Sequence, residues 1–231
     1  MSTETTQAQR KNLYRGSMGP QEARDKLTRL SQRLGLTELK IKESRAEGGP
    51  VQLSFKYQGA RLERACSTQP TTGANLVCLA LWLEDRARNL ERGIETFTEA
   101  FADALVLVHG EGGAAGGAAP EFAGERVNYY EGSRSVEDCI ALFRAVFPRL
   151  KIPEADVKVT WDTEANWARL RMRLPSGAIV EKVSRVQKNF TANLAVLALW
   201  LQARARNWER GIESLDLDRV FAGNLLPARA S

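Results

Sequence analysis

The chain has few of the residues from which most active sites are built. Its 231 residues include one histidine, His109, in a glycine-rich segment that cannot hold a catalytic base in position. The three cysteines are far apart and form no CxxC pair, so they indicate neither a disulfide framework nor a zinc site. HExxH, GxSxG and phosphate-loop motifs are all missing. We therefore expect a non-catalytic protein with no metal and no cofactor.

Long hydrophobic runs are missing as well. The longest nearly apolar run, residues 192–201, is about half as long as a membrane-spanning helix. The polar N-terminus, MSTETTQAQRKN, does not resemble a signal peptide. Unpaired cysteines are typical of a reducing compartment. With 43% hydrophobic and 26% charged residues, the composition is that of an ordinary globular protein, and we expect a cytoplasmic location without membrane contact.

The chain does contain a clear internal repeat. Residues 74–95 recur as residues 192–213 with 17 of 22 positions identical, and NLYRGS at 12–17 returns as NYYEGS at 128–133. Between the copies lies GEGGAAGGAAP, a segment with little to pack. The sequence therefore predicts a tandem duplication with a disordered N-terminal tail (1–11), a first repeat (12–108), a Gly/Ala-rich linker (109–125) and a second, more basic repeat (126–226).

The two copies predict the same order of elements. Apolar residues at helical spacing open each repeat, after start signals at Gly19-Pro20 and at Ser135 with Asp138. Three alternating segments then predict strands, at 38–43, 51–57 and 60–66 in the first repeat and at 156–161, 168–174 and 178–184 in the second. The repeated apolar segment closes each module as a long helix, and shorter helical tails are expected over 97–108 and 216–226. The predicted fold class is α+β, a duplicated α-β-β-β-α module whose three-stranded antiparallel sheet is covered by helices on one face.

This order resembles that of double-stranded-RNA-binding domains, a family in which tandem copies on a linker are common. The resemblance implies a shared order of elements and nothing about individual binding residues. Those domains carry a lysine cluster at the start of the last helix, which only Arg185 and Lys188 of the second repeat approximate. The first repeat departs from the family pattern at this point.

The uncovered sheet face differs between the copies. Because strand side chains alternate, Trp167, Arg169, Arg171 and Arg173 share the outward face of the second repeat. The equivalent first-repeat positions are nearly neutral, namely Pro50, Gln52, Ser54 and Lys56. Arginine binds phosphate through two parallel hydrogen bonds, and Trp161 or Trp167 can stack on a base. The alternative interpretation is a solvated edge strand whose charges prevent aggregation.

Two further segments of the second repeat are basic. Residues 165–210 contain nine basic and two acidic residues, against six and five in the corresponding residues 47–92. Arg185 and Lys188 precede a helix whose N-terminus disfavours cations, and a bound phosphate would remove this conflict. In the shared RARNxERGIE segment, Arg204, Arg206 and Arg210 either grip phosphates or are cations at a helix C-terminus, where they could also form the contact between two pseudo-symmetric modules.

These features favour DNA or RNA binding as the function. The expected contact residues lie in the second repeat and are Trp167, Arg169, Arg171, Arg173, Lys182, Arg185, Lys188, Arg204, Arg206 and Arg210. The alternative is a protein–protein adaptor built as a pseudo-symmetric scaffold. With nucleic-acid binding, the first repeat is expected to serve as a scaffold, as a homo-oligomer contact or as a site for a protein partner. In the adaptor, both modules present surfaces to an acidic partner.

Overall fold

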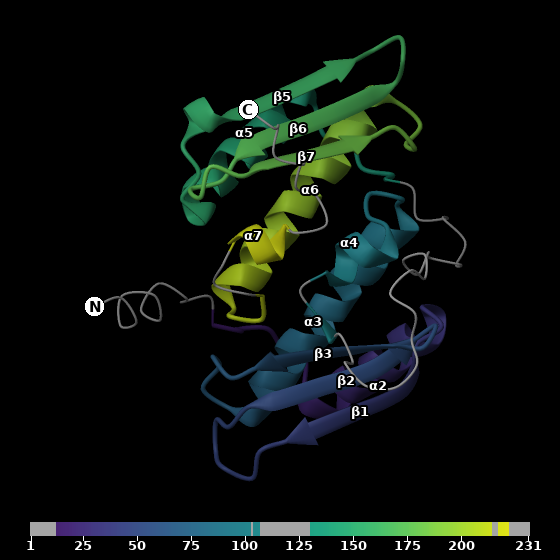
Figure 1. Ribbon diagram of the computed structural model, residues 1–231, viewed down its shortest axis with the longest axis vertical. Coiled ribbons are helices and arrows are strands. Elements are labelled where there is room, and N and C mark those ends of the chain that lie inside the picture. Colours follow the sequence, from purple (N-terminus) through teal and green to yellow (C-terminus); the bar gives the residue numbers. More distant parts are fainter. Residues whose placement is uncertain (1–12, 103, 107–129, 214–216, 222–231) are drawn as a thin grey trace.

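A computed structural model describes residues 13–102, 104–106, 130–213 and 217–221, so the predicted tail and linker lie outside the described residues. The described chain forms two modules with the predicted order of helix, three antiparallel strands and long helix (Figure 1). The α+β fold class is confirmed. The elements of the first module are α2 (Pro20–Arg33), β1 (Thr37–Glu43), β2 (Val51–Tyr57), β3 (Ala60–Cys66) and α3 (Thr72–Glu91).

The second module repeats this order with two short 3-10 turns inserted after its first helix. Its elements are α5 (Val136–Val146), η1 (Phe147–Leu150), η2 (Glu154–Asp156), β5 (Val157–Asp162), β6 (Trp167–Arg173), β7 (Ile179–Ser184) and α6 (Phe190–Glu209). The helix start signals are confirmed. Gly19 is the N-cap of α2, and Ser135 and Asp138 form a capping box at the start of α5.

One predicted element is wrong in part. Of the helix expected over 97–108, the described part is helical only as α4 (Phe97–Phe101), and the chain then forms β4 (Leu105–Val106), while 103 and 107–108 lie outside the described residues. This short strand pairs antiparallel with β3, with Leu105 opposite Leu62, and adds a fourth strand to the first sheet. A free strand edge offers backbone hydrogen bonds that the periodicity of a short segment cannot reveal. In the second module, the tail expected over 216–226 contains α7 (Leu217–Val220) within its described part.

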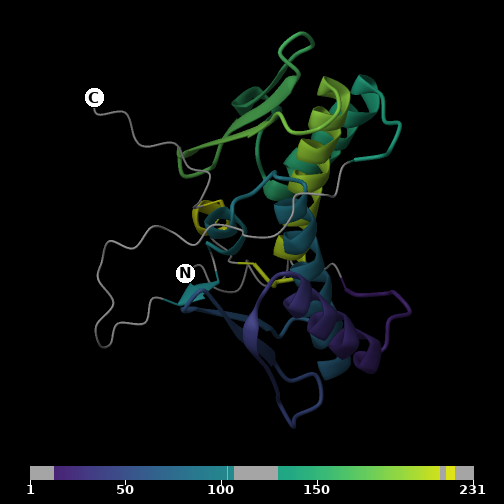
Figure 2. The same ribbon diagram turned by 90° about the vertical axis from the view of Figure 1, so that its right-hand side faces the viewer.

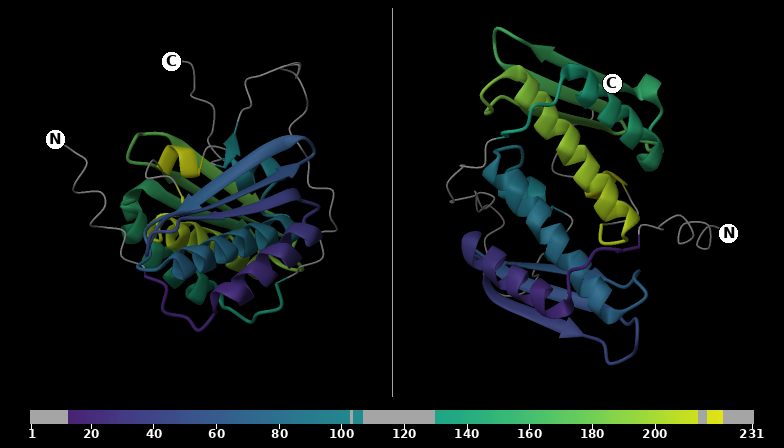
Figure 3. Two further views of the ribbon diagram at one scale, coloured as in Figure 1. Left: turned by 90° about the horizontal axis from the view of Figure 1, so that it is seen from below. Right: turned by 180° about the vertical axis from the view of Figure 1, so that it is seen from behind.

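The two long helices lie at the centre of the molecule. Helices α3 and α6 contact each other, and the two sheets lie at opposite ends with these helices between them (Figures 1 and 2). Seen from behind, α2 and α5 flank the long helices on the inner side of their own sheets (Figure 3). Trp82 and Trp200, at equivalent positions of the long helices, are fully buried. Each sheet therefore has one face packed on helices and one face directed outward.

Equivalent residues make equivalent contacts in the two modules. The side-chain oxygen of Asn75 accepts a hydrogen bond from the backbone of Gln69 at 3.0 Å, and Asn193 accepts one from Gln187 at 3.1 Å. The same glutamine side chains then accept from the backbones of Tyr14 and Tyr130, each at 2.8 Å. The similarity between the modules therefore extends to their buried polar contacts.

Just after its long helix ends, each module contributes one residue to the hydrophobic core of the other module. Gly93 and Gly211, with φ of +64° and +70°, turn the chain at the ends of α3 and α6. Ile94, which follows the first glycine, packs in the hydrophobic core of the second module. Ile212, at the equivalent position, packs in the core of the first. The RARNxERGIE segment thus forms the reciprocal contact between modules that its recurrence suggested.

Candidate nucleic-acid interface

The predicted alternation along β6 is confirmed. Ala168, Leu170 and Met172 are buried, whereas Arg169, Arg171 and Arg173 are exposed on the opposite face. The strand order is β5-β6-β7, so the three arginines lie on the central strand of this sheet. The interpretation as a charged edge strand is therefore wrong, because a central strand has no free edge to protect.

The neighbouring strands add charges that the sequence had not connected with this face. Lys158 of β5, exposed, is directly opposite Arg171, and Glu181 of β7 is opposite Arg171 on the other side. Arg173 lies 4.0 Å from the carboxylate of Asp156. Within the described residues, Arg169, Arg171 and Lys158 make no ion pair. Like charges in direct cross-strand positions repel, so Arg171 and Lys158 form an exposed positive pair.

The two tryptophans lie on different faces of the sheet. Trp167 is on the arginine face, and the guanidinium carbon of Arg169 lies 5.1 Å from the centre of its ring. Trp161 is opposite Ala168, a buried residue, and therefore lies on the inner face at the sheet margin. Of the two tryptophans considered for base stacking, only Trp167 therefore shares the arginine face. Arg169 covers one side of Trp167, which restricts stacking there.

Arg185 and Lys188 are both exposed. Because Ser184 pairs with Ala168, the next residue, Arg185, lies at the Trp167 end of the sheet. Lys188 lines a hollow of about 480 Å³ at the start of α6, together with Arg134 and Glu131. Asn189 caps the helix by accepting a hydrogen bond from the backbone of Ala192 at 2.8 Å. The helix start is thus a second basic feature of this module, partly offset by Glu131.

Lys182 does not lie with these residues. It is on the inner face of β7, only 6% exposed, and its Nζ is 2.8 Å from the carboxylate of Glu99 in α4 of the first module. The prediction of a nucleic-acid contact does not fit this position, because the strand alternation directs Lys182 towards the other module.

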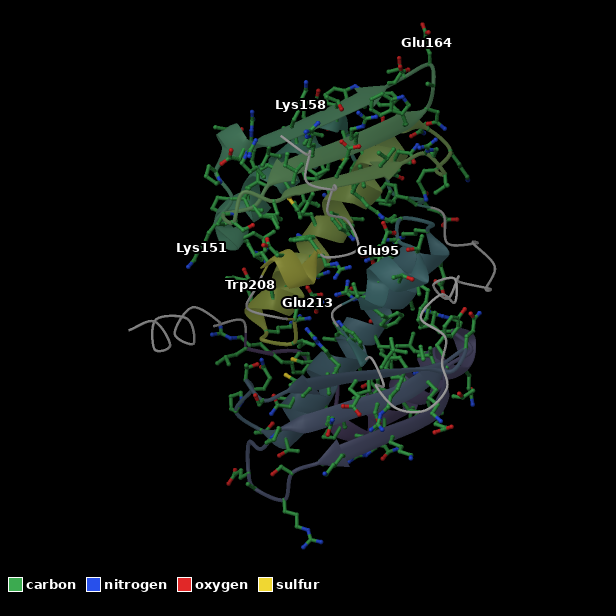
Figure 4. All side chains as sticks on the ribbon, in the orientation of Figure 1. Glu95, Lys151, Lys158, Glu164, Trp208 and Glu213 are labelled. Atoms are coloured by element: carbon green, nitrogen blue, oxygen red, sulfur yellow. The ribbon has the colours of Figure 1, made fainter. Side chains whose placement is uncertain are left out.

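Arg204 is also removed from the surface. It is fully buried and pairs with the carboxylate of Glu95 in the first module, while Arg86 pairs reciprocally with Glu213 of the second. Trp200 donates a further hydrogen bond to Glu95 at 2.8 Å. Figure 4 labels Glu95 and Glu213, which lie in the central layer between the two sheets. Arg204 is therefore part of the module interface, and its expected role in nucleic-acid contact does not fit.

This buried pairing controls the ionisation of Glu95. Burial by itself would raise the pKa of the carboxyl, but the positive charges of Arg204, Arg86 and Lys182 and the hydrogen bond from Trp200 outweigh it. The result is a pKa of about 2, against an ordinary 4.5. Glu95 is therefore a carboxylate throughout the neutral range, and its ion pair with Arg204 crosses the contact between the modules.

Arg206 and Arg210 lie at the same interface, at the end of α6 far from the arginine face. The guanidinium of Arg206 is 3.9 Å from Asp85 of the first module. The backbone oxygen of Arg210 accepts a hydrogen bond from Thr68 of the first module, and the equivalent oxygen of Arg92 accepts one from Gln187 at 3.2 Å. Of the two interpretations of the shared segment, the structure supports the module contact.

The outward face of the first sheet is more basic than the sequence suggested. Lys40 and Lys42 of β1 are opposite Ser54 and Gln52, so their side chains lie on the outward face with Lys56. Arg61 of β3 lies opposite Lys56 and joins them. The description of this face as nearly neutral is wrong, because it considered the middle strand alone.

The described residues contain no group of three or more His, Cys, Asp or Glu side chains arranged to hold a metal ion. Among the same residues, no helix combines the length and the apolar character needed to span a membrane. The thiols of Cys66, Cys78 and Cys139 are free and buried.

Comparison with known proteins gives no relative for this chain. No protein-family model matches it, and neither the curated proteins nor the solved structures include a significant match. The resemblance to double-stranded-RNA-binding domains therefore remains one of element order alone.

Proposed function

We propose that this protein binds nucleic acid without catalysing a reaction on it, through the outward face of the second sheet. We call this surface the second basic face and define it by Lys158, Trp167, Arg169, Arg171, Arg173 and Arg185. The observation that carries the proposal is the exposure of Arg169 and Arg171 on a central strand, with no carboxylate in ion-pair distance among the described residues.

Several physical features of this face favour a phosphate ligand. Cations spaced along one strand are about 6.6 Å apart, since alternate residues share a face at a rise of about 3.3 Å per residue. Lys158 and Arg171 repel each other in the free protein. Glu181, opposite Arg171 on its other side, offsets part of this repulsion, and a bound polyanion would relieve the rest. Each arginine guanidinium can donate two parallel hydrogen bonds to the oxygens of one phosphate, a geometry that the ammonium group of lysine lacks.

The same geometry predicts a largely sequence-independent mode of binding. The face carries one aromatic ring, and Arg169 covers one side of it. Base recognition by stacking is therefore limited, and phosphate contacts supply most of the affinity. Because such contacts release counterions, the affinity should fall steeply as salt is raised.

Fluorescence anisotropy with labelled single-stranded and double-stranded DNA and RNA tests the proposal. At about 50 mM salt we expect binding to at least one of the four, with a large loss of affinity at about 200 mM. Binding to none of them at the lower salt would overturn the proposal. The exposed cations would then fit the other function considered from the sequence, an adaptor with an acidic protein partner.

A charge-reversal variant locates the binding surface. Arg169→Glu with Arg171→Glu should weaken the tightest binding by about tenfold or more, because two phosphate contacts become repulsions. Arg29→Glu with Lys151→Glu is the matched control, since both residues are exposed and lie outside the outward sheet faces, on α2 and at the end of η1. Equal affinity of the two variants would show that another surface binds.

A further inference from the structure

The first sheet presents a second set of cations on its outward face. Strand alternation places Lys56 of β2 outward between buried Phe55 and Tyr57. The register then brings Lys40 and Lys42 of β1 and Arg61 of β3 to the same side. We call these four residues the first basic face.

Two of the four cations are already paired with acids. Lys56 lies 2.7 Å from Glu38, and Arg61 pairs with Glu63. Lys40 and Lys42 are exposed and make no ion pair within the described part of the chain. The face therefore keeps an excess of positive charge, as the second basic face does.

The ionisation of Glu38 reports the same positive surroundings. A hydrogen bond from Lys56, together with the charges of Lys56, Lys40 and Arg61, lowers the pKa of this exposed carboxyl. Lys40, Lys56 and Arg61 also line a shallow hollow of about 50 Å³ with Ser54. Three of the four cations, Lys40, Lys56 and Arg61, are thus gathered around Glu38 and act on its carboxyl, while Lys42 lies farther along β1 on the same face.

The two basic faces point away from each other. Both sheets turn their inner faces to the central helices and lie at opposite ends of the molecule (Figures 1 and 2). Sheet, helix, helix and sheet stack at roughly 10 Å per layer, so the outward faces are about 30 Å apart. Duplex DNA has a persistence length of about 150 base pairs, so a short duplex cannot bend around the molecule to touch both.

We infer that the first basic face is a second nucleic-acid-binding surface and that one molecule of this protein joins two nucleic-acid segments, one at each end. This inference rests on the proposed function of the second basic face. It replaces the expectation that the first repeat serves as a scaffold, as a homo-oligomer contact or as a site for a protein partner. Without an exposed aromatic ring among its defining residues, the first basic face should bind through phosphates alone.

The test uses the full chain and two batches of a short duplex of about 20 base pairs, one carrying a donor dye and one an acceptor. At about 50 mM salt, the wild-type protein should bring donor and acceptor together and reach two duplexes per protein molecule in a titration. Lys40→Glu with Lys42→Glu should weaken the second binding step by about tenfold or more and abolish energy transfer. Binding of the first duplex should stay unchanged.

The outcomes separate this inference from the proposed function. Arg29→Glu with Lys151→Glu should bridge duplexes like the wild type, which controls for the change in total charge. If the wild type binds a single duplex without energy transfer, the inference is overturned while the proposed function stands. Undiminished transfer by the Lys40/Lys42 variant would also overturn it, since the duplexes would then be joined by association of protein molecules. If the wild type binds no duplex, this inference is overturned, and the anisotropy measurement with the single-stranded probes then decides the proposed function.

Discussion

At the scale of single residues, the strongest constraint lies in the interface between the modules. Glu95 and Glu213 are 2% exposed, and each pairs with an arginine of the other module's long helix. Removing one partner of a buried ion pair leaves an uncompensated charge, which costs far more than the loss of an exposed pair. We therefore expect these two pairs, Arg204 with Glu95 and Arg86 with Glu213, to determine how the modules dock.

Acid should weaken this contact in a defined pH range. The pKa of Glu95 is about 2 in the folded protein against an ordinary 4.5, so its carboxylate stabilises the fold above pH 4.5, and this stabilisation is lost as the pH falls from 4.5 towards 2. The shift corresponds to about 3 kcal/mol. Glu95→Gln should lower the free energy of unfolding by about that amount at pH 7 and flatten its decline in acid, as measured by urea unfolding at several pH values.

Glu154→Gln is the matched control for this prediction. Glu154 pairs with Arg144, and both side chains are more than half exposed. Exposed pairs contribute about 0–1 kcal/mol, so this variant should unfold nearly like the wild type at every pH. Equal effects of the two substitutions would show that the Glu95 pairing does not hold the modules together.

At the scale of elements, the ends of the long helices determine where the chain goes next. Gly211 has a φ of +70°, a conformation that alanine adopts only with strain and that asparagine tolerates better. Gly211→Ala should therefore lower the free energy of unfolding by about 1 kcal/mol, and Gly211→Asn by less. Thermal unfolding of the three proteins gives the order of stability. A Gly211→Asn variant less stable than Gly211→Ala would contradict this account.

The helices and strands were largely predictable from the sequence. The residues that their side chains contact in the other module were not. The alternation that placed Arg169 and Arg171 outward is a local property of one strand, and the structure confirms it. The roles of Lys182 and Arg204 depend on Glu99 and Glu95, which are distant in the chain and belong to the other module. No periodicity within a segment can show such a partner.

The contributions of neighbouring strands to the two basic faces were missed for the same physical reason. Lys158 and Lys40 belong to the basic faces only because of the pairing register with β6 and β2, and register is a relation between segments. Strand β4 likewise exists because the edge of β3 is available to it. The origin of the two modules by duplication stays a prediction, which their equivalent glutamine–asparagine contacts favour.

At the scale of the whole molecule, the exchange of two isoleucines makes each module part of the other's core. Ile212 follows the long helix of the second module and is buried in the core of the first, and Ile94 does the reverse. Neither core is complete within its own module. We therefore expect the two modules to unfold together in one cooperative transition.

Ile212→Ala tests this coupling directly. The truncation leaves a cavity in the first module's core and should lower the free energy of unfolding by about 2–5 kcal/mol, although the substituted residue belongs to the second module. Hydrogen exchange should show faster exchange at buried amides of β2 and α2, far from position 212 in the sequence. Ile179→Ala, on the half-exposed outward face of β7, is the control and should leave these amides protected. Loss of protection confined to the second module after Ile212→Ala would show that the modules fold independently. The two basic faces would then not be held in a fixed arrangement by the shared core, and the spacing of about 30 Å between bound segments would no longer follow from the fold.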